Sequence, residues 1–202
     1  MTPEAFLRRL ARIPAPPHSL NLYAGRSHAA NIRRQNLATY LAAMHRRAPH
    51  TLLLGEAPGH RGARLTGVPF SCESLLQTHP FFAHEPYQFI RPDAPRQSET
   101  SATIVWNALA TRPEIPLIWN IFPFHPHQPA APHTNRPPNT AELALGKAIL
   151  LDLLQTFPIQ RIAAVGRKAE SMLTNSPLPV TYIRHPARGG KQKFIEGLEK
   201  FG

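Results

Sequence analysis

The chain has 202 residues, of which 42% are hydrophobic and 17% are charged. A chain of this length and composition can bury a core without disulfides or metals, so we expect one domain over residues 1–202. The 23 lysines and arginines exceed the 12 acidic residues, which gives a net charge of +11 before any histidine is protonated. Such an excess favours a polyanionic partner, nucleic acid above all, with a basic surface of no special use as the alternative.

The cysteine count and the hydropathy pattern exclude several classes of protein. Cys72 is the only cysteine, which rules out an internal disulfide, a zinc site built on thiolates and a cysteine-ligated iron-sulfur centre. No apolar stretch approaches the roughly 18 residues that span a bilayer, so we expect a cytoplasmic protein without a membrane partner. The basic segment 6–13 resembles a membrane-surface helix, but Glu4 and Pro14 favour a short helix that docks on the fold.

Short apolar runs and longer helical patterns alternate along the chain. The helical patterns cover residues 29–47, 98–110, 140–155, 167–173 and 190–200, and the runs typical of buried strands cover 51–55, 116–121, 161–166 and 180–184. Asn139 and Glu142 form the N-cap and N3 positions of a capping box before the third helical pattern. This alternation predicts an α/β fold with a parallel sheet covered on both faces.

The loops that follow the predicted strands are the place to look for a site, because ligands of such sheets bind beyond the carboxyl ends of the strands. These loops read GEAPGHRG, NIFPFHPHQP, GRKAE and RHPARGGKQK. Three of the four combine proline with histidine and other polar groups, which is unusual for simple connections.

The motifs GEAPG, TGVPF, IWN and RHP, in this order, are similar to those of the uracil-DNA glycosylase superfamily, and most stand at the end of a predicted strand. The resemblance is closest to the bacterial branches whose first motif is GEAPG, and NRPPNTAEL is also similar to them. It implies a three-layer α/β/α sandwich around a four-stranded parallel sheet. It also implies a monofunctional DNA glycosylase of base excision repair that removes uracil or a related deaminated base from single- or double-stranded DNA. We expect a monomer without a cofactor, since Cys72 alone cannot hold the iron-sulfur cluster that some members of this branch bind.

For the flipped base, the resemblance and the residue chemistry together point to the first two motifs. Phe70, 13 residues after Ala57, is the expected stacking wall, because stacking on an aromatic ring is worth about 1–3 kcal/mol per base. Asn120 ends an apolar run with an amide that a pyrimidine edge, offering one carbonyl and one N–H, would satisfy. Backbone of the glycine-rich loop completes the expected pocket at Gly55, Ala57, Pro58 and Gly59. The alternatives are a core aromatic at 70 and an amide at 120 that ties two loops together.

The expected catalytic residues are Glu56, His185 and Asn120. The resemblance assigns to His185 a donor role toward the carbonyl of the departing base, where a donor is worth several kcal/mol in a dry site; capping of the next helix is the alternative. His125 and His127 could instead supply this donor or form a metal pair, but no third ligand follows, so we expect no metal. Position 57 holds alanine where the best-known branch has an aspartate. Glu56 therefore either handles the water or ties the loop by accepting its N–H groups.

Basic residues of two loops are expected to bind DNA. Arg61 and Arg64 stand in the first loop, and Arg188, Gly189, Lys191 and Lys193 stand in the last, where backbone N–H groups and a helix start suit a phosphate. In relatives this last loop enters the minor groove, but here it lacks the usual serine and the apolar wedge. Arg188 is the expected substitute for the wedge.

Two other functions remain open at this point. Ala57 and the altered last loop favour a lesion-binding module that is catalytically weak or inactive. A small-molecule hydrolase ranks lower, because neither a nucleophile elbow nor a phosphate-binding P-loop is present.

Overall fold

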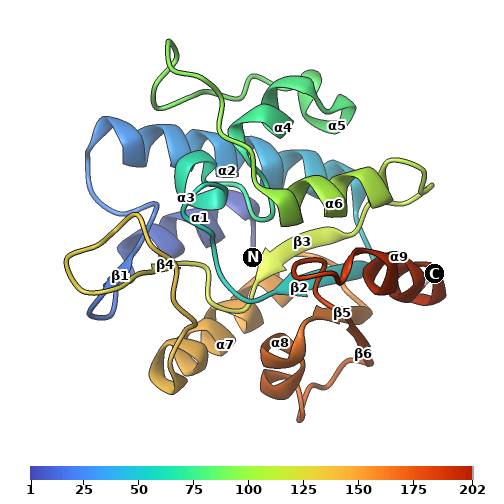
Figure 1. Ribbon diagram of the computed structural model, residues 1–202. Coiled ribbons are helices and arrows are strands. Elements are labelled where there is room, and N and C mark those ends of the chain that lie inside the picture. Colours follow the sequence, from blue (N-terminus) through green and yellow to red (C-terminus); the bar gives the residue numbers. More distant parts are fainter. Residues whose placement is uncertain (202) are drawn as a thin grey trace.

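A computed structural model describes residues 1–201 of the predicted domain. Gly202 lies outside the described residues. The centre of the domain is a four-stranded, fully parallel sheet in the order β3-β2-β5-β6 (Figure 1). The strands are β2 (Thr51–Gly55), β3 (Leu117–Asn120), β5 (Arg161–Val165) and β6 (Val180–Ile183). Leu52, Leu53 and Leu54 are fully buried, as expected for a central strand covered on both faces.

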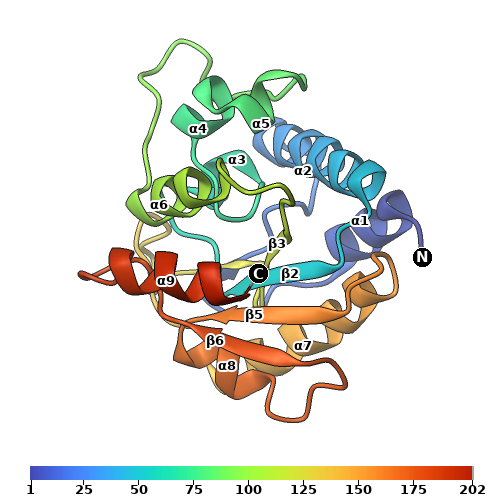
Figure 2. The same ribbon diagram turned by 90° about the vertical axis from the view of Figure 1, so that its right-hand side faces the viewer.

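Helices cover both faces of this sheet and confirm the predicted α/β/α sandwich. Figure 2 shows α6 (Thr100–Leu109) and α9 (Lys191–Phe201) on one face, with α7 (Thr140–Leu154) and α8 (Arg167–Met172) on the other. The long α2 (His28–Arg47) lies on the same side as α6. No helix within residues 1–201 is long and apolar enough to cross a membrane.

The N-terminal helix α1 (Pro3–Arg12) packs against both α2 and α7, and Phe6 makes an edge-to-face contact with Trp119 of β3. The basic segment that includes residues 6–13 is thus a helix docked on the fold, as its flanking residues predict. Thr2 accepts a hydrogen bond from the Ala5 N–H at 3.2 Å and caps this helix.

The predicted elements are present, with ends that differ by one or two residues for most of them. The predicted strand 116–121 is shorter at both ends. Pro116 has no N–H to donate, and the Ile121 N–H makes the last ladder bond to β2, to the carbonyl of its final residue Gly55 at 2.8 Å. Sequence patterns missed three short helices between β2 and α6, which are α3 (Ala63–Thr66), α4 (Glu73–Thr78) and α5 (Pro80–Ala83). Helices of four to six residues carry too little periodicity to be recognised.

A two-stranded antiparallel sheet, also missed, joins the N-terminal segment to the proline-rich loop after β3. It pairs β1 (Ser19–Leu20) with β4 (His125–Pro126). The same loop is fixed by Arg136, whose guanidinium makes two hydrogen bonds to the buried Glu142 carboxylate, at 2.7 and 2.6 Å. Glu142 also completes the predicted capping box with Asn139. The residues 125–139 are therefore an ordered wall of the fold rather than a free loop.

Candidate active site

A pocket of about 210 Å³ lies where β2, β3 and β6 end, between the loops that the motifs predicted. It is lined by Glu56, Ala57, Pro58, Gly59, Ala63, Phe70, Ser71, Glu99, Ser101, Asn120, Asn135 and His185. We call it the motif pocket. Its volume is below the roughly 300–1,000 Å³ that suit drug-sized ligands, so a single small ring system fits it better than a large ligand.

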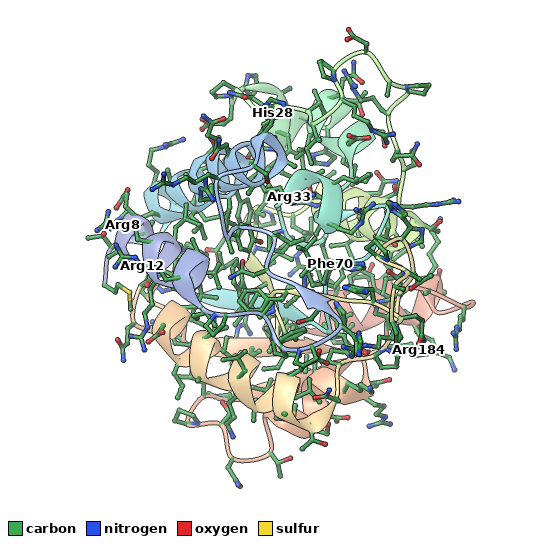
Figure 3. All side chains as sticks on the ribbon, turned by 90° about the vertical axis from the view of Figure 1, so that its left-hand side faces the viewer. Arg8, Arg12, His28, Arg33, Phe70 and Arg184 are labelled. Carbon is green, nitrogen blue, oxygen red and sulfur yellow. The ribbon has the colours of Figure 1, made fainter. Side chains whose placement is uncertain are left out.

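Phe70 forms one wall of the motif pocket, with its ring on the end of β2 and labelled near the centre of Figure 3. A Cβ atom at Gly55 would lie 2.1 Å from Cε2 and 2.3 Å from Cζ of this ring, so only glycine permits the contact. The backbone of Phe70 has a positive φ of 47°, and its carbonyl accepts a hydrogen bond from Trp106 Nε1 at 2.8 Å. A fixed carbonyl of this kind holds the residue in a conformation that non-glycine residues rarely adopt.

Asn120 ends β3 inside the motif pocket, where the residue is only 3% exposed. Its Oδ1 atom is buried and has no hydrogen-bond partner among residues 1–201. A buried polar atom without a partner costs about 1–3 kcal/mol, so the fold keeps this amide at a cost. A tie between two loops, the alternative for this amide, would have given Oδ1 a partner, and the described residues contain no such partner.

His185 follows β6 and reaches the same pocket. Its Nδ1 accepts a hydrogen bond from the Ala187 N–H at 3.1 Å, which assigns the ring proton of the neutral imidazole to Nε2. Burial lowers the pKa of His185, and the nearby Arg184 lowers it further, whereas Glu99 raises it. The ring is therefore neutral at pH 7, with Nε2–H as a donor and without a charge of its own.

Two carboxylates line the motif pocket, and they differ in what they bond. Glu99 is the N-cap of α6, and its two oxygens accept the N–H groups of Ser101 and Ala102 at 3.0 and 2.8 Å. Glu56 is 37% exposed and stands 3.8 Å from Lys168 Nζ of α8. Within residues 1–201 its side chain accepts no hydrogen bond from a loop N–H, so the predicted tie of the loop is not what this carboxylate does.

Backbone contacts hold the first loop instead of Glu56. The Pro58 carbonyl lies 2.8 Å from Nδ1 of the buried His125, and the Glu56 carbonyl accepts the Phe122 N–H at 3.1 Å. The other nitrogen of His125 lies 3.2 Å from the Pro132 carbonyl, and burial lowers the pKa of this histidine to about 4. His125, the alternative donor or metal ligand, is thus engaged with two backbone carbonyls and does not line the motif pocket.

The residues predicted to bind DNA lie outside the motif pocket. Arg61 and Arg64 face a neighbouring hollow on the far side of the first loop. Arg188 and Gly189 have positive φ values of 53° and 74°, which make the tight turn before α9, and Lys191 and Lys193 are exposed at the start of that helix.

Sequence reasoning missed several residues of the pocket wall: Ala63, Ser71, Glu99, Ser101 and Asn135. Asn135 accepts the His60 N–H at 2.8 Å and so links the proline-rich loop to the first loop. The sequence offered one indication of Asn135, because it begins the segment NRPPNTAEL, which resembles the bacterial branches of the superfamily. Glu99 lies inside the predicted helix 98–110, whereas α6 begins one residue after it, with Glu99 as its N-cap, and nothing in the sequence places α6 beside His185.

A scan against family models matches the uracil DNA glycosylase superfamily over residues 45–200. The chain belongs to this superfamily. Among solved structures, this chain is similar to the crystal structure of wild-type Pedobacter heparinus SMUG2, with a TM-score of 0.69 and 16% sequence identity. The similarity covers 98% of this chain and 95% of that chain. This similarity extends the shared fold to the N-terminal segment that the family model does not cover. No curated protein matches the sequence.

Proposed function

We propose that this superfamily member is a monofunctional DNA glycosylase that hydrolyses the N-glycosidic bond of uracil or of a related deaminated base in DNA. The observation that supports this most is the buried Asn120 amide, whose Oδ1 has no partner in the described chain. A uracil edge offers an N–H to this oxygen and a carbonyl to the amide N–H₂ group. A pocket of about 210 Å³ suits one flipped base and excludes the rest of the duplex.

Stacking on Phe70 offsets the cost of extruding the base. Flipping costs a few kcal/mol, and stacking against an aromatic ring returns about 1–3 kcal/mol. Gly55 lets the ring lie directly on the end of β2, so the base occupies the space above a rigid surface. Ala57, Pro58 and Gly59 supply backbone on another side of the same space.

His185 stabilises the leaving group. As the bond between the sugar C1′ and the base nitrogen breaks, the electron pair leaves with the base and positive charge develops on the sugar. The Nε2–H of a neutral His185 donates to a carbonyl of the base as negative charge grows there. A neutral donor is suited to this role because it does not lose its own proton to the base.

Glu56 orients the water that completes the reaction. Of the two carboxylates in the motif pocket, it is the one whose oxygens are not used by N–H groups of α6. The water oxygen bonds to C1′ and its proton passes to the carboxylate or to the departed base. Because departure of the base is the difficult step, this role contributes less than those of Asn120 and His185.

DNA is the expected partner, bound by one chain acting as a monomer in the cytoplasm. The net charge of +11 and the basic loop with Arg188, Lys191 and Lys193 support binding to the phosphate backbone. Arg188, held at a positive φ in an exposed turn, is the side chain proposed to fill the vacated stack.

Base release is the direct test. Purified protein is incubated with single- and double-stranded oligonucleotides that contain uracil, hypoxanthine, xanthine or hydroxymethyluracil, and the free base and the alkali-labile site are both measured. We expect both products from at least one substrate and none from cytosine-containing DNA. If no substrate yields a free base, the proposal fails.

Ala57 supports one alternative, a module that binds lesion DNA without turnover, because no side chain at this position can hold a water. This alternative predicts tight, salt-sensitive binding to the same oligonucleotides with no free base. It also predicts that Glu56→Ala leaves this binding unchanged, so the base-release measurement separates the two functions.

A further inference from the structure

A second hollow of about 430 Å³ lies next to the motif pocket, on the other side of the first loop. We call it the arginine hollow. Its lining includes four arginines and two histidines: Arg33, Arg61, Arg64, Arg91, His60 and His133. Gly59 lines the motif pocket, and the next residue, His60, lines the arginine hollow. In the same way Asn135 lines the motif pocket and His133 lines the arginine hollow, so the same two chain segments separate the two spaces.

Arg33 forms the inner part of this hollow. It belongs to α2 and is only 8% exposed, and Figure 3 shows it beside α3, with Phe70 nearer the sheet. Its Nε atom is buried without a hydrogen-bond partner, and its guanidinium takes part in none of the ion pairs within residues 1–201. A buried charge of this kind is costly unless something pairs with it.

Arg33 shares the arginine hollow with three other arginines, Arg61, Arg64 and Arg91. No aspartate or glutamate lines the arginine hollow in the described part of the chain. Burial and the charge of Arg64 lower the pKa of Arg33 to about 10, although the neighbouring Tyr23 acts in the opposite direction. Burial followed by the charge of Arg91 likewise lowers the pKa of Arg64. Arg64 is thus repelled by both Arg33 and Arg91, in a wall that holds no compensating carboxylate among the described residues.

The hollow is also partly preorganised for an acceptor. Arg64 is held by its Nε–H bond to the His60 carbonyl at 3.1 Å and by a contact of 3.2 Å to His133 Nδ1. Nδ1 of His60 is a second buried atom without a partner. Fixed guanidinium donors of this kind match the oxygens of a phosphate, which accept two N–H bonds from one arginine.

We propose that the arginine hollow binds a backbone phosphate of the DNA strand that flanks the flipped nucleotide, with Arg33 as its innermost contact. The inference rests on the proposed function for the identity of the strand. The sequence predicted only Arg61 and Arg64 as DNA-binding residues of this region, and the structure places Arg33 and Arg91 in the same hollow. A strand is favoured over a free phosphate because the hollow is open and shares a wall with the motif pocket. The buried, unpaired charge of Arg33 then destabilises the free protein, and the bound phosphate pairs with it.

Neutral phosphate analogues provide the test. Each phosphodiester near a uracil in a single-stranded oligonucleotide is replaced in turn by methylphosphonate, and the dissociation constant is measured for the wild type and for Arg33→Gln. We expect Arg33→Gln to bind the unmodified strand about ten- to a hundredfold more weakly. We also expect the slope of log K against log salt to fall by about 0.7 per lost contact. One methylphosphonate position should weaken the wild type by a similar factor and leave Arg33→Gln nearly unaffected.

Arg8→Gln is the matched control, since Arg8 is an exposed arginine of α1 that lies away from Arg33 in Figure 3. It removes the same charge, and we expect less than a twofold change in binding. Thermal unfolding adds a second readout. Removing an unpaired buried charge should leave the melting temperature of Arg33→Gln unchanged or higher, whereas a structural role for Arg33 would lower it.

Three outcomes overturn the inference: equal loss of binding in Arg8→Gln and Arg33→Gln, no methylphosphonate position that couples to Arg33, or a lower melting temperature with normal binding. If inorganic phosphate stabilises the wild type but not Arg33→Gln, while no position of the strand couples, the hollow binds free phosphate and the DNA assignment is wrong. Binding is measured without base release, so a protein that binds as expected but excises nothing would contradict the proposed function and leave this inference standing.

Discussion

The motif pocket and the arginine hollow lie on either side of one loop, which gives Gly59 and Ala63 to the first and Arg61 and Arg64 to the second. The motif pocket offers a phenyl face, an amide and a neutral imidazole, and it contains two carboxylates. The arginine hollow offers four arginines and no carboxylate in the described residues. Each also holds a buried polar atom without a partner, Oδ1 of Asn120 in one and Nε of Arg33 in the other.

This difference indicates what each space is built to contact. An unpartnered amide discriminates between bases by hydrogen bonds, which change with the base edge. An unpartnered guanidinium binds a phosphate, and because every nucleotide carries the same phosphate, this contact does not discriminate between bases. Substitutions in the motif pocket should therefore act on the chemical step, and substitutions in the arginine hollow should act on binding.

His185→Ala should have an effect on the rate as large as that of any substitution in the motif pocket. Loss of a donor to developing charge costs about 10²- to 10³-fold in rate, so we expect a fall of that size in the single-turnover excision rate with unchanged DNA affinity. His28→Ala is the control, because His28 is an exposed histidine at the start of α2. An excision rate within threefold of the wild type in His185→Ala would remove His185 from the mechanism.

Gly55→Ala should damage both the pocket and the fold. The new Cβ would stand 2.1 Å from the Phe70 ring, so the ring must move and the stacking wall is lost. We expect about 1–3 kcal/mol less stability in denaturant unfolding and a five- to hundredfold slower excision. Gly59→Ala, with no atom within 4 Å of its added Cβ, is the control for stability. Equal stability of the two variants would contradict the described packing of Phe70.

The motif pocket could be predicted from the sequence, because its residues belong to short motifs at the ends of the predicted strands. Glycine, asparagine and histidine at the ends of three buried runs predicted the motif pocket, since parallel strands end at one edge of the sheet. Arg33 was not predicted, because it stands inside a regular helix and its burial depends on how α2 meets the short α3. Contacts between distant segments, such as Glu99 beside His185 or β1 beside β4, leave no periodic signal either.

Glu56→Gln should have a smaller effect than the loss of His185. We expect excision to be slower by at most about tenfold, because the captured water is activated less well while departure of the base, the difficult step, is unaffected. Glu114→Gln, an exposed carboxylate away from both spaces, is the control. A loss of a thousandfold or more would show that water capture limits the reaction and would reverse the order of roles proposed for the pocket.

The smallest effect concerns pH. Burial holds the pKa of His125 near 4, below its ordinary value of 6.5, so the unfolded chain takes up this proton first as the pH falls. Stability is thus lost between about pH 6.5 and pH 4. His125→Gln should lose less stability than the wild type over this window, as measured by urea unfolding at pH 7.5, 6 and 5. A steeper loss in the variant would mean that the two carbonyls hold a charged imidazole.

The division between the two spaces is tested most directly by measuring dissociation constant and single-turnover excision rate together, on one uracil-containing strand, for Asn120→Ala and Arg33→Gln. We expect the two variants to show opposite patterns of rate and affinity. Asn120→Ala should excise about 10²- to 10³-fold more slowly with unchanged affinity, and Arg33→Gln should bind at least tenfold more weakly yet excise at the wild-type rate at saturation. Two variants that lose rate and affinity in the same proportion would contradict it.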